Sequence, residues 1–127
     1  MKTIIAGSRN INDYNLLLKA IRNSGFKITE ICSGGANGVD GLGERYGREH
    51  GIPVQIFPAA WEDFSVPCVV KINRFGRKYN AMAGYKRNRQ MAENAEALIA
   101  VHNGSPGTRD MVNVAKEYGL KIFEYSI

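Results

Sequence analysis

Short apolar runs recur along the chain, and the stretches between most of them repeat apolar residues at helical spacing. The runs predict buried strands at residues 3–6, 28–33, 53–57, 96–101 and 121–125. The intervening stretches predict helices over about 13–24, over 39–50, from 83 onward and over 107–118. Asn12 or Asp13 is expected to cap the first helix, and Gly25 to end it.

The alternation of strands with helices sets the expected fold class. Right-handed crossovers make such strands parallel and cover both faces of the sheet with helices. We therefore expect an α/β fold: a single Rossmann-like domain over residues 1–127, with a mainly parallel five-stranded sheet flanked by helices. Ligands of such sheets bind beyond the carboxyl ends of the strands, where the strand order reverses. The loops that follow the strands are therefore the places to search for a site.

Residues 62–80 interrupt the alternation, because they are longer than an ordinary loop of a compact domain. An apolar run at 69–72 and the turn sequence after it predict a hairpin insertion. The hairpin carries basic and aromatic residues, namely Lys71, Arg74, Phe75, Arg77, Lys78 and Tyr79. Such residues suit contact with a base, a phosphate or nucleic acid. The alternative is a solvated hairpin or a contact between subunits.

The composition favours an anionic partner and otherwise restricts the possible functions only a little. Seventeen Lys and Arg against twelve Asp and Glu give a net charge of +5, which favours an anionic partner of unspecified kind. No apolar stretch approaches the roughly 20 residues that cross a bilayer, and no signal-peptide pattern is present. A cytoplasmic protein without membrane contact is expected. Cys32 and Cys68 lack the spacing of a metal site or a disulfide framework, and we expect neither a metal nor a cofactor.

The segment SGGANGVDG at residues 33–41 joins the second predicted strand to the second helix. The first-turn N–H groups of a helix are unpaired and carry partial positive charge, so they bind phosphate where the chain approaches closely. Gly34, Gly35 and Gly38 permit that approach beside Ser33, and Asp40 is placed to accept from a ribose hydroxyl or to fix the loop. The segment matches neither G-x-G-x-x-G nor G-x-x-x-x-G-K-[ST]. A tight turn that needs glycine for its shape is the alternative.

Two further loops carry small donor residues at the same end of the sheet. They follow the first and fourth strands, and their candidate ligand-binding residues are Gly7, Ser8, Arg9, Gly104, Ser105, Gly107 and Thr108. Three converging loops favour a cleft for a phosphate-bearing ligand.

Three side chains outside these loops are further candidates. Arg87 and Asn88, near the start of the third helix, suit phosphate and a base or sugar edge, although basic neighbours also suit a solvated helix face. Trp61 follows the third strand and suits stacking on a base, or a place in the core or an interface. For His102, at the end of the fourth strand, a structural role is expected.

Several motifs together resemble one superfamily. They are GSRNINDY at 7–14, CSGGANGVDGLGERYGREHGIPV at 32–54, FPAAW at 57–61, AGYKRNRQM at 83–91 and NGSPGTRDM at 103–111. The chain resembles the SLOG superfamily of Smf/DprA and LOG-like Rossmann domains. Within it, the YspA/YpsA-like branch and a phage-type member with a longer hairpin are most similar. The resemblance implies a nucleotide or nucleotide-derived ligand in the cleft, and a homodimer.

The resemblance also bears on catalysis. LOG enzymes release a base from a nucleoside monophosphate with a catalytic Arg and a catalytic Glu. Arg87 occupies the Arg position, but Met111 occupies the Glu position, and a thioether supplies neither a charge nor a base for N-glycoside cleavage. Asp110 and Asp40 are the remaining carboxylate candidates. Asp110 is one residue away, which turns a helical side chain by about 100°.

Three functions therefore follow from the sequence. The first is a sensor or sequestering module that binds a nucleotide, phosphoribosyl or ADP-ribose-like ligand. The second is a phosphoribohydrolase or related N-glycosidase acting on nucleoside monophosphates or NAD-related nucleotides, in which Arg87 and Asp40 are catalytic. The third is DprA-like binding of single-stranded DNA, suggested by the basic hairpin and the net charge. We expect the first.

Overall fold

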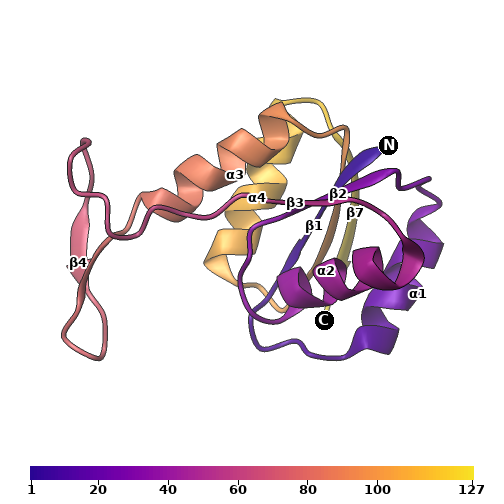
Figure 1. Cartoon of the computed structure of the whole chain (residues 1–127), viewed down its shortest axis with the longest axis horizontal. Helices are drawn as coiled ribbons and strands as arrows, with labels where there is room; N and C mark the ends of the chain where they lie inside the picture. The colour runs from indigo at the N-terminus through magenta and orange to yellow at the C-terminus, as the bar shows by residue number, and fades with distance from the viewer.

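A computed structural model describes residues 1–127 and shows a five-stranded sheet with helices on both faces (Figure 1). The strands are parallel, in the order β3-β2-β1-β6-β7. Their bounds are β1 (Lys2–Gly7), β2 (Glu30–Ser33), β3 (Val54–Ile56), β6 (Ala97–His102) and β7 (Lys121–Ser126). The helices are α1 (Tyr14–Ser24), α2 (Val39–His50), α3 (Ala83–Glu93) and α4 (Pro106–Glu117). The predicted α/β, Rossmann-like fold is confirmed.

The sheet has a hydrophobic core on each face. Successive strand residues point to opposite faces, so Ile4 packs on the side of α3 and α4 while Ile5 packs on the side of α1 and α2. Leu98 and Ile99 in β6 divide in the same way. All six residues of β6 are buried, as expected for a central strand covered on both faces.

The observed element ends follow local chemistry. Asp13 caps α1 by accepting from the N–H groups of Asn15 and Leu16, and Gly25 ends it in the left-handed conformation. The second strand is shorter than predicted. β2 begins at Glu30, which pairs with Lys2 at the start of β1. Residues 28 and 29 therefore lie outside the sheet.

Helix α2 lies close to the sheet where its glycines face it. A Cβ added at Gly43 would come within 2.8 Å of the Ile5 side chain, and one at Gly47 within 2.4 Å of Val54. The two glycines are four residues apart and therefore lie on the same face of α2, against the sheet. The start of α2 also lies close to the end of β1, where the N–H of Val39 donates to Ser8 O at 3.3 Å.

The predicted hairpin is present and projects from the body of the molecule (Figure 1). Strands β4 (Val70–Ile72) and β5 (Lys78–Asn80) pair antiparallel. The Asn73 side chain orders the turn by accepting from the N–H groups of Phe75 and Arg77. At the base, Asn80 is buried; its backbone N–H donates to Trp61 O at 2.6 Å and its side chain donates to Asp63 O at 3.0 Å. No helix of the protein is long and apolar enough to cross a membrane.

Candidate functional site

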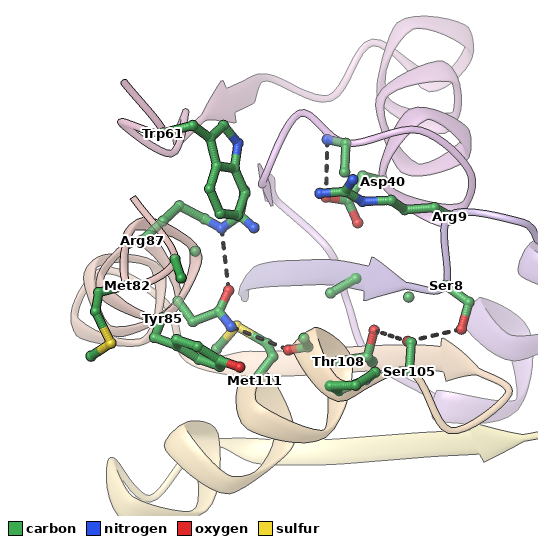
Figure 2. A pocket seen from close by; sticks show the side chains of 18 of the residues that line it. Ser8, Arg9, Asp40, Trp61, Met82, Tyr85, Arg87, Ser105, Thr108 and Met111 are labelled. Carbon is green, nitrogen blue, oxygen red and sulfur yellow. Dashed lines mark hydrogen bonds between the residues drawn. The ribbon is translucent and has the colours of Figure 1, made fainter. Parts of the chain in front are cut away.

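A cleft of about 640 Å³ lies at the carboxyl ends of the strands. From β1 the chain continues to β2 and β3 on one side of the sheet, whereas β6 and β7 lie on the other side. The cleft lies where these two directions meet, which is the usual ligand position in an open α/β sheet. Figure 2 shows Trp61 and Arg87 on one side of it and Ser8 with Ser105 on the other.

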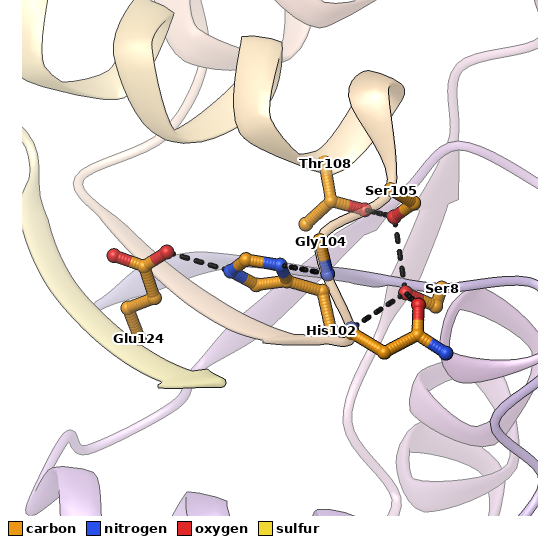
Figure 3. A network of polar contacts seen from close by, with 7 residues as sticks. Ser8, His102, Gly104, Ser105, Thr108 and Glu124 are labelled. Atoms are coloured by element: carbon orange, nitrogen blue, oxygen red, sulfur yellow. Dashed lines mark hydrogen bonds and ion pairs between the residues drawn. The ribbon is translucent and has the colours of Figure 1, made fainter. Parts of the chain in front are cut away.

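The end of the cleft next to β1 and β6 is a chain of hydrogen-bonded hydroxyl groups (Figures 2 and 3). The Ser8 hydroxyl donates to Asn103 Oδ1 at 2.8 Å and lies 3.0 Å from Ser105 Oγ. Ser105 in turn donates to Thr108 Oγ1 at 2.9 Å. The two loops that follow neighbouring strands are thus joined through side chains, and all four residues line the cleft.

His102 holds the loop after β6 through a hydrogen bond to Gly104. Its Nδ1 accepts from the N–H of Gly104 at 3.0 Å, which leaves the proton of a neutral ring on Nε2, 2.6 Å from Glu124 Oε2 (Figure 3). Gly104 has a φ of +90°, a region that favours glycine. Gly104 therefore shapes the loop and does not line the cleft, and His102 has a structural position, as expected.

The N-terminus of α4 opens into the cleft. Gly107 and Thr108 line it, and their backbone N–H groups have no protein partner because they lie in the first helical turn. Ser105, at the N-cap, makes no capping hydrogen bond to them. Helices α2 and α3 also lack a side-chain cap, whereas α1, which does not line the cleft, is capped by Asp13.

Asp40 of α2 and Arg87 of α3 both line the cleft. Asp40 is 6% exposed and accepts from the N–H of Ala36 at 3.3 Å. Burial raises the pKa of its carboxyl, against the lowering effects of the Ala36 N–H and of Arg87. Arg87 donates to the Gly34 carbonyl at 2.7 Å, and burial lowers the pKa of its guanidinium. Charged groups are thus kept partly dehydrated at the cleft surface.

Gly34 makes this arrangement sterically possible. A Cβ added there would lie 2.6 Å from Arg87 Nη1 and 2.8 Å from Asp40 Oδ2. Both distances are shorter than any ordinary contact of a Cβ atom, so a side chain would push the two apart. The sequence suggested a phosphate approach at Gly34, but its observed position is against Arg87 and Asp40.

Asn88 joins α3 to α4 instead of presenting a free amide. Its Nδ2 donates to Asp110 Oδ2 at 2.9 Å and to Gly107 O at 3.2 Å, and its Oδ1 accepts from Arg87 Nε at 3.2 Å. Asp110 does not line the cleft, whereas Met111 does. Asp40 is therefore the only carboxylate on the cleft surface.

Ser33, Gly35 and Gly38 of the 33–41 segment do not line the cleft. Ser33 is fully buried; it donates to Glu44 Oε2 at 2.8 Å and accepts from the N–H of Gly35 at 3.1 Å. Gly35 and Gly38 line a second, shallower hollow on the outer side of the loop. Gly38 has a φ of +74° and approaches Ser8 so closely that a Cβ would lie 2.3 Å from its carbonyl oxygen. Of the residues predicted from this segment, only Asp40 lines the main cleft.

The structure adds residues to the cleft lining, among them Lys71 and Tyr79, which the sequence indicates as hairpin residues suited to a base or a phosphate without connecting the hairpin to the cleft. Val69, Lys71 and Tyr79 line the cleft from the hairpin, and Tyr85 lines it from α3. The alternation of residues 69 and 71 is a signal for a shared face. Which face would turn toward the cleft depends on the position of the whole hairpin.

The fold and the position of the cleft define the class of the protein as a Rossmann-like α/β protein with a cleft at the reversal of strand order. The chain belongs to the YspA, cpYpsA-related SLOG family, whose match covers residues 1–64. The resemblance to SLOG proteins is thereby confirmed, while the phage-type assignment stays a prediction.

A solved structure has a similar fold. It is DNA processing protein A (DprA) from Streptococcus pneumoniae, with a TM-score of 0.71 and 19% sequence identity. The likeness covers 97% of this chain and 49% of the DprA chain, so this chain spans about half the length of that protein. A comparison with curated proteins gives no match.

Proposed function

We propose that the protein binds a nucleotide or a nucleotide-derived ligand, of phosphoribosyl or ADP-ribose-like chemistry, and acts as a sensor or sequestering module. The observation that carries this proposal is the uncapped first turn of α4, where Gly107 and Thr108 line a cleft of about 640 Å³ and their N–H groups have no protein partner. A phosphate there would accept from both N–H groups at the positive end of the helix. Membership of the SLOG family agrees with a ligand of this kind.

The charge of the cleft supports an anionic ligand. Arg9, Lys71 and Arg87 line the cleft against a single carboxylate, Asp40. Because burial raises the pKa of that carboxyl, its negative charge is disfavoured relative to a carboxylate in water. The balance of charge on the cleft surface is thus positive.

The Gly107→Asp substitution tests the phosphate position. A Cβ at Gly107 meets no atom within 4 Å, and a carboxylate in a first helical turn is stabilising, so the variant should fold. It should bind ribose 5-phosphate and AMP at least about a hundredfold more weakly, because like charges would meet in the site. Titration calorimetry measures this, with Gly107→Asn as the neutral control. Equal binding by the wild type and Gly107→Asp would contradict the proposal.

N-glycoside hydrolysis is a second candidate, favoured by the position of Asp40. In this reaction, water adds to the anomeric carbon while the C–N bond breaks and the base leaves with a proton. A buried carboxyl with a raised pKa suits proton transfer in such a step. Incubation with nucleoside monophosphates and nicotinamide nucleotides, followed by chromatography for free base, tests it. Turnover that Asp40→Asn abolishes would support hydrolysis, and tight binding without free base would exclude it.

A further inference from the structure

One face of the hairpin belongs to the cleft. The register pairs Lys71 directly with Tyr79, and side chains of directly paired residues lie on the same face of a sheet. Both line the cleft together with Val69, two residues before Lys71. Ile72 and Lys78 form the next pair, on the opposite face, and do not line it. The hairpin thus presents a different set of side chains to each side.

Trp61 and Tyr79 together form an aromatic wall of the cleft. The Trp61 ring meets the Tyr79 ring edge to face, with centroids 6.2 Å apart and an interplanar angle of 73°. It also lies on the first turn of α3, where a Cβ at Gly84 would come within 2.9 Å of the indole. The Trp61 carbonyl accepts from the N–H of Asn80, the residue after Tyr79. This backbone hydrogen bond at the hairpin base therefore holds both rings in position.

The two ends of the cleft differ in chemistry. The end formed by Ser8, Ser105 and the first turn of α4 offers hydroxyl and N–H groups, whereas the hairpin end offers Trp61 and Tyr79, with Tyr85 of α3 nearby. Aromatic rings suit the flat face of a base, and stacking on them is favourable for every base. Lys71 adds three N–H donors beside Tyr79, which suit the acceptor atoms at a base edge.

We propose that Trp61, Tyr79 and Lys71 form a base-binding subsite, so that the hairpin selects complete nucleotides over phosphosugars. This inference rests on the proposed function, in which the phosphate lies at α4. The base then lies between the hairpin and α3, and the sugar lies beside Asp40 and Arg87. The hairpin insertion is thereby a specificity element of the cleft.

The test compares ligands with and without a base on the full chain. Ribose 5-phosphate, AMP and GMP are titrated by calorimetry against the wild type and Tyr79→Ala. The wild type should bind the nucleotides roughly tenfold to a hundredfold more tightly than ribose 5-phosphate, the size expected for stacking of one base. Tyr79→Ala should reduce this ratio and leave the affinity for ribose 5-phosphate unchanged. Lys71→Ala should reduce the ratio and also weaken the binding of all three ligands, because it removes a positive charge from the cleft.

Lys78→Ala and Ile72→Ala are the matched controls, because they alter the same hairpin on the face away from the cleft. Both should keep the wild-type ratio. Trp61 gives an independent readout, since it is the only tryptophan of the chain: AMP and GMP should change its fluorescence and ribose 5-phosphate should not. Nucleotide binding no tighter than that of ribose 5-phosphate, or a ratio unchanged in Tyr79→Ala, overturns the base subsite while the proposed function survives. Absence of binding by all three ligands overturns both.

Discussion

Strands β6 and β4 show how differently two parts of one chain are stabilised. Every residue of β6 is buried between helices, whereas every residue of β4 is exposed. Burial of apolar area holds β6 in place. The hairpin has almost no buried apolar surface and depends on hydrogen bonds at its turn and at its base, through Asn73 and Asn80. The sheet should therefore respond to changes of side-chain volume, and the hairpin to the loss of single polar groups.

Truncation of one isoleucine in each region should give the largest contrast. Ile99 in β6 is 0% exposed and Ile72 in β4 is 65% exposed. We expect Ile99→Ala to lower the free energy of unfolding by about 2–5 kcal/mol, because it leaves a cavity. Ile72→Ala should change it by no more than about 0.5 kcal/mol. Urea denaturation measures both, and a large loss at Ile72 would indicate that this face is covered by a second copy of the chain.

Asn80→Ala should lower the free energy of local unfolding of the hairpin base by about 1–3 kcal/mol, because the Asp63 carbonyl and the Met82 N–H lose their partner. The effect should be local. Hydrogen exchange should therefore rise in residues 62–80 and stay unchanged in β6. Asn73→Ala, at the exposed turn, is the control and should affect only residues 73–77. Faster exchange across the whole sheet would show that the hairpin and the sheet unfold together.

Two carboxyls should give opposite dependences of stability on pH. The pKa of Asp40 is raised by burial, so its contribution to stability is present below the ordinary value of 3.8 and is lost as the pH rises through the raised pKa. The pKa of Asp63, beside the hairpin, is lowered by hydrogen bonds from Ser65, so its contribution is lost as the pH falls through the lowered pKa. Melting temperatures of Asp40→Asn and Asp63→Asn from pH 3 to 8 test this. Compared with the wild type, Asp40→Asn should gain stability as the pH rises. Asp63→Asn should lose it by a smaller amount, because Asp63 is less buried than Asp40.

The smallest effect is expected at an exposed ion pair of the hairpin region. Arg77 Nη2 lies 3.7 Å from Glu62 Oε1, and both side chains are mostly exposed. Water and salt screen such a pair, so Arg77→Ala should leave the urea midpoint unchanged within error. A measurable loss would mean that the hairpin is held by charge as well as by Asn80.

The predictable parts of the fold are those fixed by local pattern. The apolar runs predict all five sheet strands, Asp13 marks the start of α1, and the sequence after Ile72 indicates the hairpin turn.

The cleft surface was harder to predict, because it depends on directions that the chain takes after its turns. Ser33 and Gly38 belong to a glycine-rich loop like those that bind phosphate, yet Ser33 bonds to Glu44 and Gly38 packs on Ser8. Lys71 and Tyr79 are cleft residues only because Asn80 fixes the hairpin relative to Trp61. That contact joins two residues that are far apart in the sequence, so no local pattern indicates it.

The bond between His102 and Glu124 offers a control point for engineering. Glu124 lies on β7, at the edge of the sheet and away from the cleft, with 40% of its side chain exposed. Through His102 it nonetheless determines how firmly the N–H of Gly104 is held. Glu124→Gln would weaken the hydrogen bond between His102 and residue 124, and it would change no residue that lines the cleft. The rigidity of the loop can therefore be adjusted separately from the residues that line the cleft.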